Sequence, residues 1–295
     1  MGAIVETSYG KVEGTERDGV PNFRGIPFAR PPVGDLRWRP PRPPEPWIQV
    51  RDATQFGPEC PQISTSYGML SGAGNRKEWP RSEDCLYLNV WTPAADSAKR
   101  PVMVWIHGGA LVTGAGSNPA YHGQRIVNHG DIVLVTINYR LGLLGLLGHR
   151  ELTDDETGYY GNYGLHDQIA ALRWVQENIE AFGGDPGNVT IFGESAGGLS
   201  VGTLLGVPSA RGLFHKAIIQ SGGWQVVSEE AAAEKADRLS AAVGIDVKDS
   251  KRLRDLSVEQ ILEAQTDILG SGIRGRFERF LLDGNLIPKK PLEVI

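Results

Sequence analysis

Cysteine is scarce in this sequence, with only Cys60 and Cys85 among 295 residues. Two cysteines are too few for a disulfide framework, and they lack the partner ligands of a zinc cluster. Positive charge is also in deficit, because 30 Lys and Arg residues stand against 35 Asp and Glu, giving a net charge of -5. The chain therefore has no basic field of the kind that binds nucleic acid, and we expect no nucleic-acid partner.

Long apolar runs and a leader sequence are missing as well. No stretch reaches about 18 uninterrupted apolar residues, so we expect no membrane-spanning helix. The first residues show no basic and apolar leader, and Glu6 stands where a myristoylation signal needs Ser or Thr. We therefore expect a cytoplasmic protein, with secretion by another route left open.

The residues that are present describe a globular chain with a sizeable core and many tight turns, since 40% are hydrophobic and 38 are glycine. Residues 1–100 predict short hairpins and a long loop, because their first half is rich in proline and glycine. Residues 101–295 predict βαβ units, because apolar runs alternate there with helical periodicity. We expect one α/β domain over residues 1–295, with a mostly parallel sheet and helices on both faces.

Hydrophobic periodicity locates individual elements within this domain. The apolar runs predict buried strands at Val102–Ile106, Ile132–Tyr139, Val189–Phe192 and Ala217–Gln220. Apolar residues three or four apart over residues 165–179 predict an amphipathic helix. A second helix is expected over Glu229–Val243, ending at Gly244, and a third begins at Ser257, where Gln260 completes a capping box.

A serine between glycines follows the third of these strands. The sequence Gly193-Glu-Ser-Ala-Gly197 has the G-x-S-x-G pattern of a nucleophile elbow, and a helix-like stretch, Gly198–Leu205, comes after it. A serine on a tight strand-to-helix turn approaches the neighbouring backbone closely, so glycine on both sides removes side chains that would collide. The pattern predicts that Ser195 is a nucleophile; the alternative is a glycine-rich turn that contains a serine by chance.

Two more glycines follow the first strand, in His107-Gly-Gly-Ala110. They would let backbone N–H groups point into a site without obstruction, and such donors stabilise the oxygen that becomes negative in a tetrahedral intermediate. We predict an oxyanion hole made by the N–H groups of Gly108, Gly109 and Ala196, with an ordinary glycine turn as the alternative. His107 itself is expected to pack against this loop and orient it, not to transfer protons.

Longer motifs resemble one known family. The motifs are Phe23-Arg-Gly-Ile-Pro-Phe-Ala29, Ser82-Glu-Asp-Cys-Leu-Tyr-Leu-Asn-Val90 and Asn188-Val-Thr-Ile-Phe-Gly-Glu-Ser-Ala-Gly-Gly198. They closely resemble the type-B carboxylesterases, which include the cholinesterases, and the resemblance runs from about residue 3 to the end. It implies an α/β-hydrolase fold, hydrolysis of small-molecule carboxylic esters through an acyl-enzyme on Ser195, and no metal or organic cofactor.

The resemblance also implies roles for further residues. Glu194 matches a buried glutamate beside the nucleophile, and Ser221 matches a serine that supports the catalytic triad from behind. Cys60 and Cys85 match cysteines that form a disulfide at the mouth of the substrate gorge, with two free thiols as the alternative. Aromatic residues that could line an apolar gorge are Trp38, Tyr67, Trp79, Trp105, Tyr160 and Trp224.

The pattern is incomplete in one respect. A serine needs a base to take its proton and an acid to orient that base, and in this fold both follow the serine along the chain. Only His215 follows Ser195, and it does not match the family's catalytic histidine, while Asp167 and Asp185 precede the serine and are not expected to be the triad acid. We expect the acid and the histidine on a second polypeptide or on sequence beyond residue 295. The alternatives are an inactive fragment and a non-catalytic, cholinesterase-like binding protein.

Overall fold

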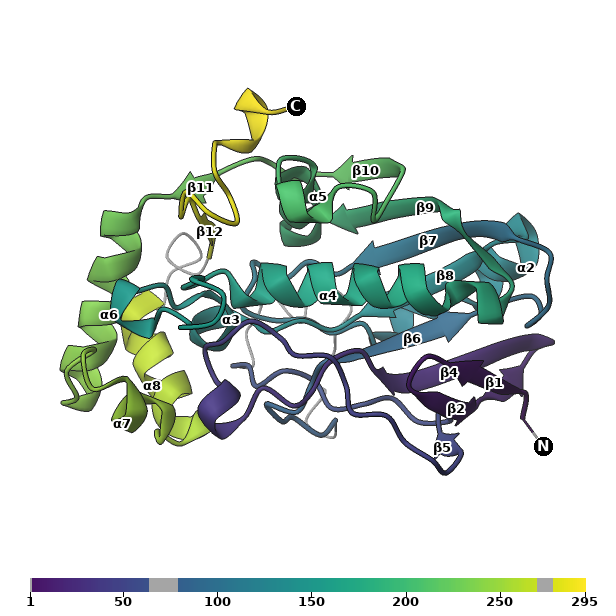
Figure 1. The fold of residues 1–295 in the computed structure, drawn as a ribbon, viewed down its shortest axis with the longest axis horizontal. Coiled ribbons are helices and arrows are strands. Elements are labelled where there is room, and N and C mark those ends of the chain that lie inside the picture. The colour runs from purple at the N-terminus through teal and green to yellow at the C-terminus, as the bar shows by residue number, and fades with distance from the viewer. Residues whose placement is uncertain (1, 64–78, 270–277) are drawn as a thin grey trace.

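A mixed β-sheet forms the centre of the molecule. The computed structural model describes residues 2–63, 79–269 and 278–295, and within them a seven-stranded sheet crosses the molecule (Figure 1). In spatial order its strands are β10 (Lys216–Gln220), β9 (Gly184–Glu194), β7 (Arg100–Ile106), β8 (Val133–Ile137), β6 (Tyr87–Trp91), β4 (Val20–Pro27) and β3 (Thr15–Arg17). The first four strands run parallel, and the last three continue the sheet in antiparallel pairs.

Shorter strands and the helices surround this sheet. One small sheet is formed by β1 (Ile4–Thr7), β2 (Gly10–Glu13) and β5 (Arg51–Asp52), and another by β11 (Val226–Val227) and β12 (Phe280–Leu281). The helices are α2 (Gln124–Gly130), α3 (Gly142–Leu146), α4 (Tyr163–Asn178), α5 (Ala196–Leu205), α6 (Glu229–Val243), α7 (Ser250–Arg254) and α8 (Val258–Leu269). In Figure 1, α4 runs along the sheet, whereas α6, α7 and α8 lie together at the end opposite the N-terminal strands.

The elements predicted from hydrophobic periodicity are confirmed, with shifts at their ends. The four predicted strands are β7, β8, β9 and β10, and the helix predicted over residues 165–179 is α4. β9 begins earlier than predicted, because Gly184 already pairs with Arg100 of β7 ahead of a register shift. The spacing of apolar residues therefore located each of these elements, while strand pairing decided where β9 begins.

Capping residues set the ends of the later helices as predicted. α6 covers Glu229–Val243 and stops at Gly244, whose φ of +66° is a left-handed conformation that glycine adopts without strain. At the start of α8, the N–H of Ser257 donates to Oε1 of Gln260 at 2.9 Å, and the N–H of Gln260 donates to the Ser257 hydroxyl at 3.2 Å. This reciprocal pair is a capping box, which satisfies two backbone donors that the helix cannot.

Alternating side chains of the parallel strands bury two separate cores. Val102, Val104 and Ile106 of β7 lie in the large core that also contains the buried faces of α4 and α5. Met103 points to the opposite face, where it packs against a smaller core that includes Val127 of α2. Successive strand residues face opposite sides of a sheet, so a strand that is apolar throughout needs cover on both. The expectation of helices on both faces is confirmed.

The order of the parallel strands creates a place for a site. β8 is added on one side of β7, and β9 is added on the other. Open α/β sheets bind ligands at such a reversal, outside the carboxyl ends of the strands. Ile106 at the end of β7 is paired with Gly193 near the end of β9. The loop after β7 and the serine after β9 therefore emerge from the sheet side by side.

A buried ion pair joins the end of β8 to α4. The guanidinium of Arg140 makes two hydrogen bonds to the carboxylate of Asp167, of 2.8 and 2.7 Å, and the Arg140 backbone N–H donates a third at 3.0 Å. Both side chains are almost completely inaccessible, at 4% and 0% exposure. The carboxylate of Asp167 is therefore fully engaged by one arginine, in agreement with the expectation that it does not serve as a triad acid.

Replacing Asp167 by alanine would leave the Arg140 charge buried without a partner. We expect Asp167→Ala to lower the free energy of unfolding by about 3–5 kcal/mol, because removing one member of a buried ion pair leaves an uncompensated charge. Urea unfolding followed by circular dichroism measures the change. Glu45→Ala, which removes one partner of the exposed Arg30–Glu45 pair, is the matched control and is expected to have little effect. Equal losses for the two variants would contradict the structural role of the buried pair.

Candidate active site

Ser195 occupies the sharp reversal between β9 and α5. Its φ of +56° and ψ of -118° lie outside the regions that L-residues normally occupy, and α5 begins at the next residue. Its N–H donates to the carbonyl of Gln220 at 2.9 Å, and its own carbonyl accepts the N–H of Leu199 at 2.8 Å. The turn is thus held by β10 on one side and by the helix on the other, and the side chain of Ser195 remains partly exposed.

Glycines beside the serine allow two backbones to come together. A Cβ at Gly197 would overlap the carbonyl oxygen of Ile106, and a Cβ at Gly193 would lie 2.7 Å from the same oxygen. Both distances are too short for any side chain. The glycine pattern that suggested an elbow is therefore required by the packing of α5 over the ends of β7 and β9.

The loop after β7, residues 107–114, is called here the β7 loop. A Cβ at Gly108 would lie 3.3 Å from the Cβ of Ser195, so the loop runs directly past the serine side chain. Within the described residues, the N–H groups of Gly108 and Gly109 donate no backbone hydrogen bond, and neither does the N–H of Ala196 outside its own helix. These unengaged donors and the Ser195 hydroxyl thus occur in one small region.

Three successive residues of the β7 loop have positive φ values: Gly109 (+114°), Ala110 (+58°) and Leu111 (+59°). A left-handed conformation costs about 1–2 kcal/mol for a residue with a Cβ. The turn is closed by the carbonyl of Gly109, which accepts the N–H groups of Val112 and Thr113 at 3.0 Å each. Strain of this kind persists only where surrounding structure enforces it, and it is concentrated at functional sites.

His107 begins the β7 loop as a buried, neutral side chain. Its ring stacks on Tyr139 with centroids 4.4 Å apart, and its Nδ1 lies 2.8 Å from the carbonyl oxygen of Gly108. A carbonyl oxygen can only accept a hydrogen bond, so Nδ1 carries the proton. Burial lowers the pKa of His107 to about 4. These contacts are those of a residue that orients the loop, as the sequence suggested.

No histidine of this chain is hydrogen-bonded to Ser195. All six lie within the described residues. His215, the one that follows the serine, accepts the N–H of Val189 in the middle of β9 through Nδ1, and Asp185 accepts the N–H of Gly187 near the start of the same strand. Neither side chain is bonded to Ser195, in line with the expectation that His215 and Asp185 are not members of the triad.

The structure places Glu194 and Ser221 on either side of what the resemblance implied: Glu194 is not buried as expected, whereas Ser221 does lie near the elbow. Glu194 is exposed, not buried, and it ends β9, which has only the edge strand β10 on one side of it in the sheet. Ser221 directly follows β10, is exposed, and has a φ of +50°. It adjoins Gln220, whose carbonyl holds the N–H of Ser195. Ser221 is therefore near the elbow but is linked to it only through the backbone.

Cys60 and Cys85 are free, buried thiols, so the disulfide implied by the resemblance is not formed in this structure. The two thiols are joined by a hydrogen bond, which together with burial raises the pKa of Cys85. The sulfur of Cys60 also accepts the N–H of Leu141 at 3.3 Å. Hydrogen bonding and core packing satisfy both sulfurs without a covalent bond.

The aromatic residues considered for a gorge are dispersed. Trp38 is completely buried and donates to the carbonyl of Leu143, while Trp105 packs against Tyr121 and Phe192. Trp224 is exposed and lies against α5 near Gly202. Tyr67 lies outside the described residues. The remaining two, Trp79 and Tyr160, contact Phe56 and Arg150 respectively.

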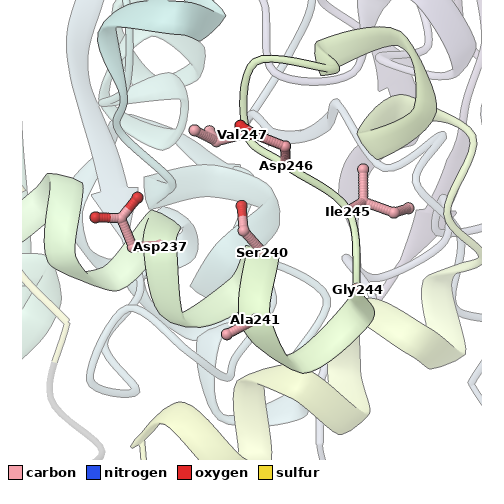
Figure 2. A pocket seen from close by; sticks show the side chains of 7 residues that line it. All are labelled: Asp237, Ser240, Ala241, Gly244, Ile245, Asp246 and Val247. Atoms are coloured by element: carbon pink, nitrogen blue, oxygen red, sulfur yellow. The ribbon is translucent and has the colours of Figure 1, made fainter.

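Other possible binding features lie away from the predicted residues. A pocket of about 340 Å³ is lined by Asp237, Ser240 and Asp246 among others, all from the end of α6 and the segment after it (Figure 2). It contains none of the predicted site residues.

Within the described part of the chain no cluster of three or more His, Cys, Asp or Glu could hold a metal. No helix among the same residues is long and apolar enough to cross a membrane.

Two residues close to the β7 loop were not singled out from the sequence. Tyr139 donates its hydroxyl to the carbonyl of His107 at 2.6 Å, and Gln62 hydrogen-bonds to Gly114 at the end of the loop. Tyr139 could have been found from strand register, because β7 and β8 pair in parallel with Ile106 opposite Ile137. Gln62 carries no comparable signal, because its contact joins segments far apart in the sequence.

With this geometry described, comparison with known proteins identifies the family. A sequence model described as "Carboxylesterase family" matches residues 2–295. The chain belongs to this family. It is 46% identical over 296 residues to the para-nitrobenzyl esterase of Bacillus subtilis (strain 168), and 45% identical over 304 residues to a precursor of medium-chain fatty acyl-CoA hydrolase from Anas platyrhynchos. These alignments cover 99% of this chain but 59% and 53% of the relatives.

Solved structures of carboxylesterases share the fold. The crystal structure of a Geobacillus stearothermophilus carboxylesterase at pH 6.2 matches with a TM-score of 0.89 and 45% sequence identity, covering 99% of this chain and 58% of that one. A structure of para-nitrobenzyl esterase gives a TM-score of 0.90 and covers 100% of this chain and 60% of that chain. The predicted α/β-hydrolase fold is confirmed, and the chain spans a little over half the length of these relatives.

The packing around the elbow predicts a strong difference between two glycine substitutions. Gly197→Ala would drive a methyl group into the carbonyl of Ile106, and we expect it to lower the free energy of unfolding by roughly 3 kcal/mol or more. Gly130→Ala at the end of α2 meets only ordinary contacts at 3.6 Å and is expected to be neutral or slightly stabilising. Thermal unfolding of both variants measures the difference. A tolerated Gly197→Ala would refute the close approach.

The neutral state of His107 predicts a dependence of stability on pH. An unfolded histidine takes up a proton below about pH 6.5, whereas burial delays protonation of His107 in the folded protein to about pH 4. Stability is therefore fully retained above about pH 6.5 and falls as the pH is lowered toward 4, by about 1.4 kcal/mol per pH unit for this one proton.

Urea unfolding of wild type and His107→Gln between pH 4.5 and 6.5 tests this linkage. We expect the shallower pH slope in the variant, because glutamine takes up no proton in either state. A slope remains in both proteins, since burial also lowers the pKa of His166, to about 3. Parallel slopes would show that His107 is not held neutral by burial.

Proposed function

We propose that this protein hydrolyses small-molecule carboxylic esters, with Ser195 as the nucleophile. One observation carries the proposal: the hydroxyl of Ser195 stands on a strained elbow beside backbone N–H groups that have no partner among the described residues. A nucleophile next to open donors is the combination that acyl transfer needs. Family membership supports the same reaction, because the relatives in the comparisons are named as esterases and hydrolases.

In the proposed reaction, Oγ of Ser195 attacks the carbonyl carbon of the ester while its proton passes to a general base. The carbonyl oxygen becomes negative and is stabilised by the N–H groups of Gly108, Gly109 and Ala196. Collapse of this intermediate breaks the bond to the alcohol, which leaves with the proton from the base, and an acyl group remains on Ser195. Water then attacks the acyl-enzyme and gives a proton to the base. The bond between the acyl group and Oγ of Ser195 breaks, the base returns the proton to Oγ, and the acid is released.

The general base is proposed to come from outside these 295 residues. None of the chain's histidines is hydrogen-bonded to Ser195, and Asp167 is occupied by Arg140. A serine without a base is a weak nucleophile near neutral pH. The alternative is a non-catalytic role in binding. The lack of a histidine bonded to Ser195 favours this alternative, whereas the presence of the elbow and of open backbone donors argues against it.

Labelling with a fluorophosphonate tests the proposal, because this reagent modifies only an activated serine. Protein expressed in its native host and purified under mild conditions retains any polypeptide that supplies the base. We expect mass spectrometry to locate the adduct on Ser195, and we expect Ser195→Ala to lower kcat/KM for para-nitrophenyl acetate by at least about 10³-fold. Ser97→Ala, which alters an exposed serine, is the control and keeps full activity.

Two outcomes would overturn the proposal. Hydrolysis that is unchanged in Ser195→Ala would assign the activity to another residue. Absence of both labelling and hydrolysis in folded wild-type protein would favour the non-catalytic alternative.

A further inference from the structure

The direction of the Gly109 N–H depends on the carbonyl of Gly108, because both belong to one planar peptide unit. Nδ1 of His107 donates to that carbonyl at 2.8 Å. Gly114 lies beside this hydrogen bond: a Cβ there would come into contact with Nδ1 of His107 and would stand 2.6 Å from the same carbonyl oxygen. Any movement of Gly114 therefore changes the space available to the Gly108 carbonyl, and with it the aim of the Gly109 N–H.

Gly114 is held by the side chain of Gln62 on both of its backbone groups. Oε1 of Gln62 accepts the Gly114 N–H at 2.8 Å, and Nε2 donates to the Gly114 carbonyl at 3.0 Å. Nε2 donates a further hydrogen bond to the carbonyl of Cys60 at 3.0 Å, and the backbone carbonyl of Gln62 accepts from Arg81 at 2.9 Å. At 7% exposure Gln62 is shielded from water, so these bonds face little competition.

The β7 loop needs such support, because Ala110 and Leu111 are held at positive φ. The carbonyl of Leu111 accepts the N–H of Gly142 at 2.7 Å, and the carbonyl of Ala110 accepts the N–H of Glu278 at 3.1 Å. These contacts fix the middle of the loop through backbone atoms alone. Gln62 adds a side chain that fixes the end of the loop, and a substitution can remove this contact without altering the loop itself.

We propose that Gln62 is a positioning residue of the oxyanion hole, which holds Gly114 so that the Gly108–Gly109 peptide presents its N–H to the substrate oxygen. The inference rests on the proposed ester hydrolysis and extends it to a residue outside the elbow and the β7 loop. Gln62 touches neither the serine nor the substrate. Its effect is on the alignment of a donor, and misalignment of a reacting group by about 1 Å can lower a rate on the order of 100-fold.

Gln62→Leu tests the inference by removing both hydrogen bonds to Gly114 at similar side-chain size. We expect kcat for para-nitrophenyl acetate to fall by about 10- to 100-fold, with KM changed by less than about threefold, because the donor acts mainly in the transition state. Affinity for a trifluoromethyl ketone, which forms a tetrahedral adduct with an oxyanion, should fall in parallel with kcat/KM. Fluorophosphonate titration of active sites corrects the rates for unfolded protein.

Gln176→Leu is the matched control. The Gln176 carboxamide also donates to two backbone carbonyls, those of Pro186 and Leu213 at 2.9 and 3.0 Å, but it does not contact the β7 loop. We expect this variant to lose thermal stability while its kcat and ketone affinity stay within about twofold of wild type. An equal loss of kcat in both variants, or no selective loss in Gln62→Leu, would show that Gln62 is only structural.

Gln62→Glu keeps the test decisive if the leucine variant does not fold. Its carboxylate could still accept the Gly114 N–H but would lose the donor to the Gly114 carbonyl, which protonation of the carboxyl group restores. We therefore expect the ratio of its kcat to that of wild type to rise as the pH is lowered from 8 to 5. A ratio independent of pH would overturn the inference. If hydrolysis does not depend on Ser195 at all, the proposed function fails, which Ser195→Ala reveals separately, and the inference fails with it.

Discussion

The close approach of two backbones at the carboxyl ends of β7 and β9 is the constraint on which the rest of the candidate site depends. Gly193 and Gly197 leave no room for a side chain against the carbonyl of Ile106. α5 can therefore begin directly over the sheet, which forces the chain to reverse at Ser195 with a φ of +56°. The same reversal turns the serine hydroxyl out of the core. Strain at one residue is thus the consequence of tight packing between its neighbours.

The two sides of the site are supported in different ways. The elbow is short, and its strain is balanced by local bonds to Gln220 and within α5. The β7 loop is longer, and its left-handed turn is held by contacts from Gln62, Gly142 and Glu278, which come from widely separated parts of the chain. A donor that is already fixed needs no reorganisation when charge develops on a substrate. Fixing it requires the whole fold, because the loop cannot hold this conformation alone.

Burial and ion pairing also control the charges inside the domain. His107 is neutral because it is desolvated, and Arg140 is neutralised by Asp167. Glu194 lies next to the elbow but is exposed to solvent. Among the described residues, Ser195 and the open backbone donors thus lie together with no histidine bonded to the serine. The chain spans 59% of the Bacillus relative, and none of its histidines is hydrogen-bonded to Ser195.

The sequence by itself determined the four parallel strands, the helices α4 and α6, the start of α8 at Ser257 and the strand–turn–helix position of Ser195, because periodicity, capping and glycine spacing act between residues close together in the chain. It also singled out Gly108 and Gly109, and the structure places Gly108 beside Ser195. The tertiary structure decided that Glu194 is exposed, that Cys60 and Cys85 are free thiols, and that the side chain of Gln62 is hydrogen-bonded to Gly114. These features depend on the packing of segments far apart in sequence, and no local pattern records which distant atoms will meet.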